Sequence, residues 1–338
     1  ANMSKFVDLK NDYYNLKNKL GRIPMMMDFL EYGSRDPWLY VKYNKAKSYV
    51  NFINLVEEEY CNVLNNNELK LMEYFNLEIN NAKRVEESLI LLSLIEKGEI
   101  TTSQLKQTIL GKYEYDVSDE TIDSCILNLN FNFIRREFKV VKQNGNTLKA
   151  DTDLLAAISN YTFKLFLLDN TNYSIRSFEK QYSKESFVGG LIRYQKYGRK
   201  DVCRVLNWDL DISATLYGYR TRNNTTPCFV TYKKSEEISQ STNYNDHFID
   251  QNTFAWESRS QRRIESDEIQ NVINSERILL FVKKEDGEGT DFYFVGDCSI
   301  VADSIKQETM DDGKPVVHFS FALDQTLKID LFNYFTES

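Results

Sequence analysis

The hydrophobic pattern of the chain changes its period near residues 183–190, and this change limits the folds that are open to it. Before this point, apolar residues recur at spacings of three and four, as in residues 4–20, which is the pattern of one helical stripe. Beyond it, short apolar runs alternate with turn residues, which is typical of β-strands. We therefore predict an α+β chain with an all-helical domain at residues 1–185 and a β-rich domain at residues 186–338.

The helical half contains a pattern that predicts a winged-helix element. Three helical runs and a hairpin with a turn at Asn144-Gly145 occupy residues 84–97, 101–110, 118–129 and 137–150. A winged helix that reads DNA should have a basic third helix, which is the helix that enters the major groove. Here the third run carries Asp119, Glu120 and Asp123 instead. We therefore favour a protein-contact or structural role for this element.

The second half predicts a small β-barrel or a strongly curved sheet, because short strands follow one another with turns between them. The expected strands are residues 215–220, 228–233, 253–258, 279–283, 291–295, 316–323 and 327–331.

The composition excludes several classes of enzyme. No phosphate-binding P-loop, nucleophile elbow, zinc-protease or dinucleotide-binding motif is present. The chain has only 2 His, and its 5 Cys include no pair at metal-binding or redox spacing. We therefore expect no catalytic residues, no metal site and no cofactor in this chain. Reduced thiols and the lack of a long apolar run predict a cytoplasmic protein without a membrane span.

One stretch, residues 197–263, combines positive charge with aromatic residues inside an acidic protein whose net charge is −8. Residues 193–234 hold nine Lys or Arg against three Asp or Glu. The stretch ends in a Ser/Arg cluster at residues 258–263. Aromatic faces beside cations can hold an unstacked base and neutralise phosphates, so this pattern points to nucleic acid.

The chain resembles a known family along most of its length. Residues 197–209, with the sequence YGRKDVCRVLNWD, are similar to the C-terminal region of type IV modification-dependent restriction enzymes. In those enzymes this region follows a phospholipase-D-type nuclease and a superfamily-two helicase. Further similar segments are residues 216–219, 229–232, 254–260, 280–293 and 313–319, and more weakly residues 21–24 and 28–30 in the helical half.

This resemblance implies a helical coupler followed by a target-recognition domain with an SRA/PUA-like β-barrel. Such a module would bind duplex DNA containing 5-methylcytosine or 5-hydroxymethylcytosine, by base flipping. Its partners would be the helicase and nuclease domains of the same polypeptide. ATP and Mg²⁺ would serve those domains, whose motifs are missing here, so the resemblance implies no enzyme activity for this chain.

The chemistry of base capture selects candidate site residues. A flipped base needs aromatic faces, and a carboxylate that faces the exocyclic amine would select cytosine. The pocket candidates are Tyr217, Tyr219, Tyr232, Asp246, Phe254 and Trp256. Tyr217 and Tyr219 are expected to share one face of a strand, as are Phe254 and Trp256, so at least one of these pairs should be core. The candidates for DNA-backbone contact are Arg220, Arg222, Lys233, Lys234, Ser258, Arg259, Ser260, Arg262 and Arg263.

Two other interpretations stay open. The chain could be an interaction scaffold that docks a helicase motor without any modified-base specificity. It could also be a compact metal nuclease, built on Asp291, Asp297 and Asp303 with Lys306, although acidic loops often give such a pattern.

Overall fold

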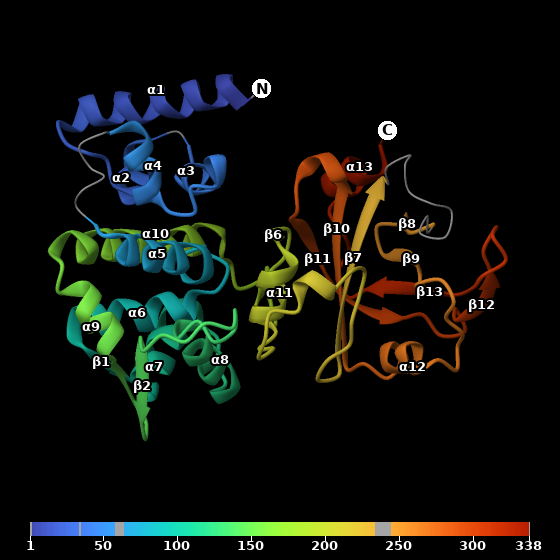
Figure 1. The fold of residues 1–338 in the computed structure, drawn as a ribbon. Coiled ribbons are helices and arrows are strands. Elements are labelled where there is room, and N and C mark those ends of the chain that lie inside the picture. The colour runs from blue at the N-terminus through green and yellow to red at the C-terminus, as the bar shows by residue number, and fades with distance from the viewer. Residues whose placement is uncertain (1, 34, 58–63, 234–244, 338) are drawn as a thin grey trace. The chain divides into compact units, whose positions relative to one another are not determined.

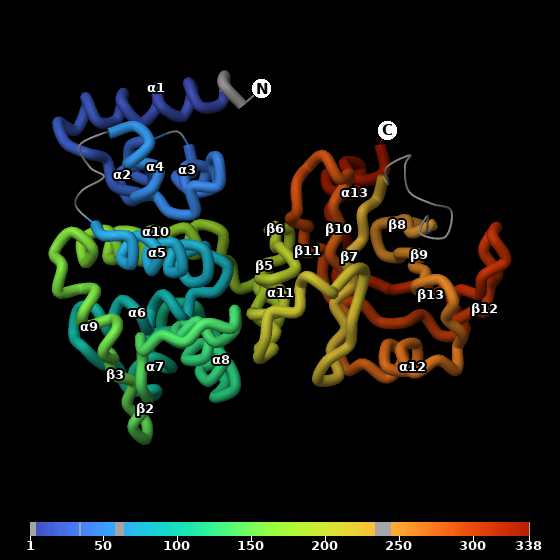
Figure 2. Tube along the Cα trace, viewed as in Figure 1, coloured from blue at the N-terminus to red at the C-terminus, as the bar shows by residue number. Residues whose placement is uncertain are grey.

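A computed structural model describes residues 2–33, 35–57, 64–233 and 245–337, shown as a ribbon in Figure 1 and as a backbone trace in Figure 2. The chain folds as two units, Ala1–Lys184 and Glu185–Ser338. The prediction of an α+β chain with a helical first half and a curled sheet in the second half is confirmed. None of the described helices has the length and apolar character needed to cross a membrane.

The first unit is built mainly of helices that bury aromatic and aliphatic side chains. Its helices outside the winged-helix element are α1 (Asn2–Leu20), α2 (Met26–Tyr32), α3 (Trp38–Lys42), η1 (Tyr43–Lys45), α4 (Tyr49–Val56), α5 (Asn66–Tyr74), η3 (Phe75–Ile79), α9 (Thr152–Ile158) and α10 (Tyr161–Gln181). Tyr13 and Tyr40 are fully buried, and the ring centroids of Tyr40 and Phe52 lie 4.5 Å apart. Aromatic packing of this kind holds the helices together.

The winged-helix element is present and has its strands in the order β1-β3-β2. It consists of α6 (Val85–Lys97), β1 (Glu99–Thr101), α7 (Thr102–Tyr113), α8 (Asp119–Leu129), β2 (Val141–Asn144) and β3 (Thr147–Ala150). The side chains of Thr101 and Ser118 accept hydrogen bonds from backbone N–H groups and so cap α7 and α8. Gly98 ends α6 in the left-handed region, with φ +81°. The hairpin turns at Gly145 and Asn146, one residue later than predicted.

The second unit is built around a mixed sheet of eight strands, in the order β7-β10-β11-β13-β9-β8, with β12 on β13 and β6 on β11. The strands are β6 (Lys196–Tyr197), β7 (Thr225–Lys233), β8 (His247–Asp250), β9 (Thr253–Glu257), β10 (Arg277–Glu285), β11 (Phe292–Ile300), β12 (Lys306–Thr309) and β13 (Pro315–Leu323). A separate hairpin joins β4 (Phe187–Val188) and β5 (Leu191–Ile192). The helices are α11 (Arg199–Val205), η4 (Ser213–Thr215), α12 (Asp267–Ile273), η6 (Asp286–Glu288) and α13 (Ile329–Thr336).

The sheet curls around one core but does not close into a barrel within the described strands, because β7 and β8 end the ladder without pairing to each other. Strand β7 runs parallel to β10, whereas the other paired strands are antiparallel.

Two of the predicted strands are wrong. Residues 215–220 form the end of η4 and an irregular segment that meets β7 only at the bridge between Tyr219 and Cys228. Residues 327–331 contain the start of α13, because Phe335 and its neighbours pack as a helix on the core. Both predictions rested on short apolar runs, and the period of so few residues does not distinguish a strand from a helix or an irregular segment.

Candidate functional site

A pocket of about 590 Å³ lies beside the end of β9 in the second unit. It is formed by α11, the segment before β7, β7 itself, β9 and the segment that follows β9. The residues that line it are Arg199, Tyr217, Gly218, Tyr219, Phe229, Val230, Thr231, Asp246, Trp256, Glu257, Arg259, Ser260, Gln261, Arg262 and Asp286. The volume falls within the range of about 300–1,000 Å³ that is common for small-molecule sites.

One wall of the pocket is a rigid stack of Trp256, Tyr219 and Arg259. The rings of Tyr219 and Trp256 meet edge to face, with centroids 4.8 Å apart. The guanidinium of Arg259 lies 4.3 Å from the centroid of the Tyr219 ring, and the Arg259 backbone N–H donates to the Tyr219 hydroxyl at 3.2 Å. Tyr219 is therefore only 3% exposed, and burial raises the pKa of its hydroxyl well above the ordinary value. This wall supports the pocket but offers little free ring surface.

Tyr217 supplies the accessible aromatic side chain of the pocket. It is 71% exposed, so its ring is open to a ligand. The sequence predicted that Tyr217 and Tyr219 share one face of a strand, and this is not so. The segment is irregular and turns one ring outward and the other inward. The Tyr217 carbonyl accepts a hydrogen bond from Nε of Arg199 at 3.2 Å, which ties the segment to α11.

Arg199 is a pocket residue that the sequence analysis missed. Its guanidinium lies 4.9 Å from the ring centroid of Phe292 and 5.5 Å from that of Phe229. Burial lowers the pKa of this guanidinium. The signal was present, since Arg199 belongs to the basic stretch, but the prediction concentrated on residues after position 216.

Carboxylates face the same pocket. The Glu257 backbone N–H donates to Oδ1 of Asp246 at 2.8 Å, which fixes the orientation of the Asp246 carboxylate at the end of β9. Asp246, for which the role of a pocket acceptor was predicted, is one of the residues that line this pocket. Glu257 and Asp286 also line the pocket, and neither was predicted.

Tyr232 and Phe254 were also predicted as pocket residues, and neither lines this pocket. Tyr232 stacks on Phe248 with centroids 6.0 Å apart, and Phe254 is fully buried against the same Phe248 at 4.8 Å. Phe254 and Trp256 do share a face of β9, and both belong to the core. Trp256 reaches the pocket because it lies next to the end of the strand.

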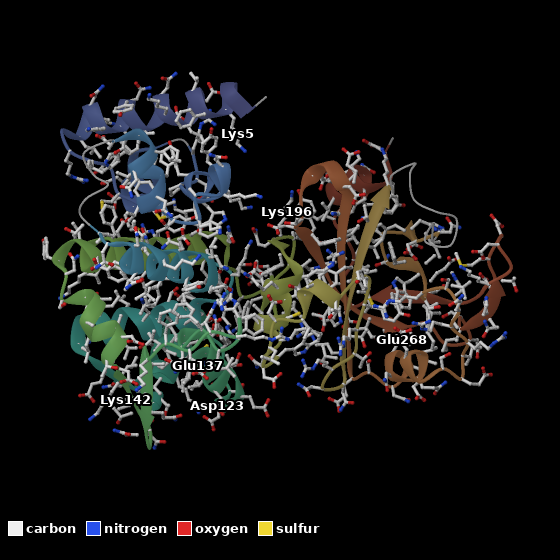
Figure 3. All side chains as sticks on the ribbon, viewed as in Figure 1. Lys5, Asp123, Glu137, Lys142, Lys196 and Glu268 are labelled. Atoms are coloured by element: carbon white, nitrogen blue, oxygen red, sulfur yellow. The ribbon has the colours of Figure 1, made fainter. Side chains whose placement is uncertain are left out.

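Several side chains of the Ser/Arg cluster, residues 258–263, form ion pairs or hydrogen bonds within the protein, which the sequence did not predict. Arg259 and Arg262 both form ion pairs with Glu268 of α12, whose position is marked in Figure 3. Glu268 therefore offsets part of their charge. Ser258 is fully buried, where its hydroxyl accepts from the Val317 N–H at 3.0 Å and donates to the Arg259 carbonyl. Ser258 is thus a structural residue, which corrects the prediction that it contacts phosphate.

The other predicted DNA contacts differ in exposure. Arg220 and Arg263 are exposed and do not line the pocket, whereas Ser260 lines it. Arg222 forms an ion pair with Asp209 at 3.0 Å and lies over the Trp208 ring. Lys233 is half-buried at the end of β7, and Lys234 lies outside the described residues.

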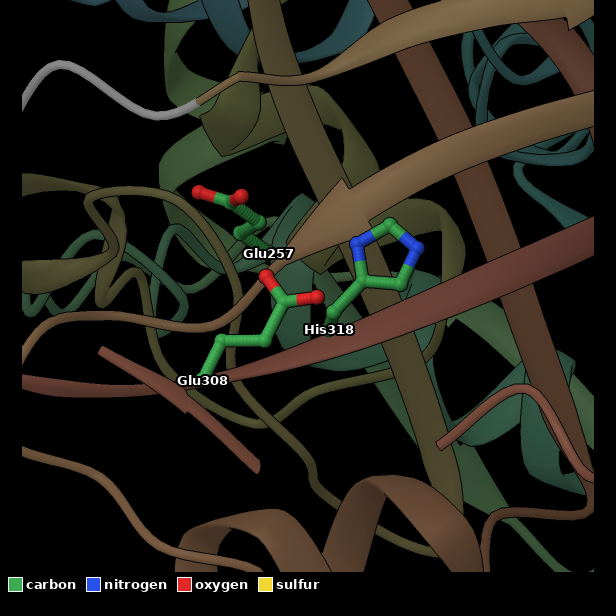
Figure 4. Close-up of side chains that lie close together, drawn as sticks. All are labelled: Glu257, Glu308 and His318. Atoms are coloured by element: carbon green, nitrogen blue, oxygen red, sulfur yellow. The ribbon is translucent and has the colours of Figure 1, made fainter. Parts of the chain in front are cut away.

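A group of three possible metal ligands lies next to the pocket, where sequence analysis expected none. Ligand atoms of Glu257, Glu308 and His318 lie within 4.8 Å of one another across β9, β12 and β13 (Figure 4). Glu308 is exposed, and exposed acidic groups are common in proteins without a metal. The geometry alone therefore assigns no metal to this group.

Comparison with protein families identifies two matching families, and both are described as domains of unknown function. The family model for the domain of unknown function DUF8090 matches residues 9–183, which is more than half of the chain. The chain belongs to the DUF8090 family. In this DUF8090 protein the second unit matches a further family model, the domain of unknown function DUF3427, over residues 191–335. No curated protein matches the sequence.

Among solved structures, the DUF8090 protein has distant similarity to chains that contain SRA domains. The SUVH5 SRA complex with hemimethylated CG DNA has 11% identity and a TM-score of 0.30, covering 43% of this chain and 96% of that one. Arabidopsis thaliana SUVH6 in complex with SAM has 10% identity and a TM-score of 0.32, covering 75% and 41%. The sulfur-binding and SRA domains of ScoMcrA with phosphorothioated DNA have 8% identity and a TM-score of 0.25, covering 75% and 90%. Similarity of this size decides nothing about the function of this chain.

Proposed function

We propose that the second unit binds duplex DNA and holds a flipped 5-methylcytosine or 5-hydroxymethylcytosine in the pocket beside β9. The observation that carries this proposal is that an exposed aromatic ring, an oriented carboxylate and a cation line one pocket of about 590 Å³, through Tyr217, Asp246 and Arg199. These are the three kinds of group that an extracted nucleotide requires.

Stacking on Tyr217 would offset the cost of extracting the base. Unpairing and unstacking one base costs a few kcal/mol. A stacked aromatic face returns about 1–3 kcal/mol. Tyr217 is assigned this role because its ring is 71% exposed, whereas Tyr219 is covered by Trp256 and Arg259.

Asp246 would select cytosine over thymine. The exocyclic amine of cytosine is a donor, while thymine presents a carbonyl at the same place. A carboxylate only accepts hydrogen bonds, so it favours the amine and repels the carbonyl. The N–H of Glu257 holds the Asp246 carboxylate in a fixed orientation, so less ordering is needed when the base enters.

The modification would be read by shape. Phe229 and Val230 are buried apolar residues on β7 that line the pocket, and Thr231 adds a hydroxyl beside them. Burial of one methyl group contributes about 0.8 kcal/mol, which corresponds to roughly fourfold tighter binding. We therefore expect modest discrimination between modified and unmodified cytosine from this contact alone.

We further infer that the helical unit couples recognition to helicase and nuclease domains of the same polypeptide, in a restriction system. This inference rests on the resemblance to type IV restriction enzymes. ATP and Mg²⁺ would act in those domains. In this chain we assign binding roles, and no catalytic residue, to the pocket.

The test is a binding titration with three matched duplexes that contain cytosine, 5-methylcytosine or 5-hydroxymethylcytosine, at two salt concentrations. Wild-type protein should bind the modified duplexes more tightly. Tyr217→Ala should weaken binding to all three by roughly 5- to 150-fold, because one stacked base is worth about 1–3 kcal/mol. A fourth matched duplex with thymine at the target position tests Asp246, because Asp246→Asn should reduce the preference for cytosine-type bases over thymine.

The matched controls are Tyr161→Ala and Asp303→Asn. Tyr161 is 75% exposed on α10, and Asp303 is exposed after β11, so neither belongs to the pocket. Equal effects of the pocket and control variants would contradict the assignment of the pocket. Equal binding of the three duplexes by wild-type protein would leave a basic surface without base recognition, and no binding at all would favour the scaffold interpretation.

A further inference from the structure

The hairpin of the winged-helix element and the loop before it form a basic segment in the helical unit. This segment, the wing, comprises residues 135–149. Its charged side chains are five basic residues and one acidic residue, namely Arg135, Arg136, Lys139, Lys142, Lys149 and Glu137. Arg135, Arg136, Lys139 and Lys142 are exposed, and Lys149 is partly exposed. Within the described part of the chain, none of the five basic side chains takes part in an ion pair.

The strand register brings two of these charges together. Lys142 of β2 lies directly opposite Lys149 of β3, so both side chains project from the same face of the hairpin. Like charges in this position destabilise a sheet. Glu99 of β1 lies opposite Lys149 on its other side and offsets part of the repulsion, but Lys142 is on the outer strand and has no such neighbour. An anion at this face would relieve the remaining repulsion.

The wing is held rigidly against the rest of the element. Oδ1 of Asn130 accepts hydrogen bonds from the N–H groups of Val140 and Val141, at 2.9 and 3.0 Å. The Thr102 N–H at the start of α7 donates to the Asn146 carbonyl at 2.8 Å, which fixes the tip of the hairpin. The basic side chains are therefore attached to a backbone that is already ordered, so less backbone entropy is lost when a ligand binds.

The charges of the third helix differ from those of the wing. Helix α8 carries Asp119, Glu120 and Asp123, and Asp119 is paired with Lys106 of α7 at 2.6 Å. Figure 3 labels Asp123 on α8 and Lys142 on the hairpin. The acidic residues of α8 favour a protein-contact or structural role for that helix, whereas the wing carries the opposite charge. Helix α8 would repel phosphates, whereas the wing attracts them.

We propose that the wing binds the phosphate backbone of duplex DNA without sequence preference, as a contact separate from the pocket of the second unit. Duplex DNA fits because it presents a dense array of phosphates to clustered Lys and Arg. A membrane surface fits less well, since the hairpin tip, residues 143–146, has the polar sequence QNGN and no apolar anchor. The proposal does not depend on the modified-base assignment.

The test uses the full chain with Arg136→Glu and Lys142→Glu combined, since both side chains are exposed. Each lost phosphate contact lowers the slope of log affinity against log salt by about 0.9, so the pair should lower it by roughly 1.8. Affinity should fall by the same factor for unmodified and 5-methylcytosine duplexes, which leaves the ratio between them unchanged. The control, Lys5→Glu with Lys10→Glu, makes the same change of charge at exposed positions on α1.

A wing variant that matches the control in affinity and in salt slope would overturn the proposal, as would a wing variant that changes only the ratio between the two duplexes. Wing-dependent binding to phosphatidylserine vesicles or to single-stranded RNA, without binding to duplex DNA, would also overturn it. Thermal unfolding of each variant checks that the fold is retained. Failure of the modified-base assignment has a different signature, because Tyr217→Ala would then leave binding unchanged while the wing variant still lowers the salt slope.

Discussion

Asp169 shows how one buried side chain connects distant parts of the helical unit. It lies on α10, and its two carboxylate oxygens accept hydrogen bonds from the N–H groups of Met26 and Met27 at the start of α2, at 2.8 and 3.1 Å. These bonds satisfy donors that the first turn of a helix leaves unpaired. Burial raises the pKa of the Asp169 carboxyl to about 7, and the two N–H donors only partly oppose this shift. The network is therefore sensitive to pH.

We predict that Asp169 makes the unfolding free energy fall as pH rises from about 4 to about 7. In this window the folded protein holds a proton on Asp169 that the unfolded chain has lost, so each rise in pH favours unfolding. Asp169→Asn should remove this dependence and lower stability by a constant amount, because an amide nitrogen cannot accept the second N–H. Urea unfolding of both proteins at pH 5, 6, 7 and 8 measures the difference. A difference between wild type and variant that stays constant over this range would contradict the prediction.

At the scale of one element, the boundary of α6 depends on backbone conformation. Gly98 has φ +81°, and its N–H donates to the Leu94 carbonyl at 3.1 Å, which closes the helix. The next residues enter β1, so the turn also sets the direction of the winged-helix sheet. A Cβ atom at position 98 would meet no atom within 4 Å, so the cost of a substitution by alanine comes from the backbone and not from a clash.

We predict that Gly98→Ala lowers the unfolding free energy by about 1–2 kcal/mol, the cost of a left-handed conformation with a Cβ. The matched control is Gly111→Ala within α7, which also has open space around it and has no positive φ. Because alanine favours a helix interior over glycine, the control should raise stability by about 0.5–1 kcal/mol. Chemical denaturation followed by circular dichroism compares the stability of the two variants. A loss of stability in both would show that the space around the added methyl group, and not the φ angle, sets the cost.

At the scale of the whole molecule, the chain divides between Lys184 and Glu185 into two units, each with a hydrophobic core. This boundary lies one residue from the one that we predict from the sequence. Units with separate cores can unfold in separate steps. The tryptophans allow the steps to be followed, since Trp38 lies in the first unit, and Trp208 and Trp256 lie in the second.

We predict that the two units unfold in separate transitions. In a Trp38→Phe variant, tryptophan fluorescence should report only the second unit, while far-ultraviolet circular dichroism should report both. Guanidinium titrations of this variant, recorded with both probes, should therefore give midpoints that do not coincide. A single shared transition with both probes would mean that the units unfold as one.

The sequence by itself determined features that depend on residues close together in the chain. Capping residues such as Thr101 and Ser118 set helix starts, Gly98 set a helix end, and the Asn-Gly pair marked the hairpin. The period of the apolar residues also gave the α+β division, because each period is a local property of a helix or a strand. Tyr217 and Asp246, two candidates from the basic aromatic stretch, line one pocket.

Only the tertiary structure decided which of the other candidates face the pocket. Phe254 and Trp256 have the same alternation and similar chemistry, and both are buried in the core, but only Trp256, next to the end of β9, also lines the pocket. Arg259 and Arg262 look like free cations in sequence, until α12 places Glu268 between them. Ser258 looks like a phosphate ligand until β13 supplies its partner, Val317. These outcomes depend on contacts between residues that the fold, and not the local sequence, brings together.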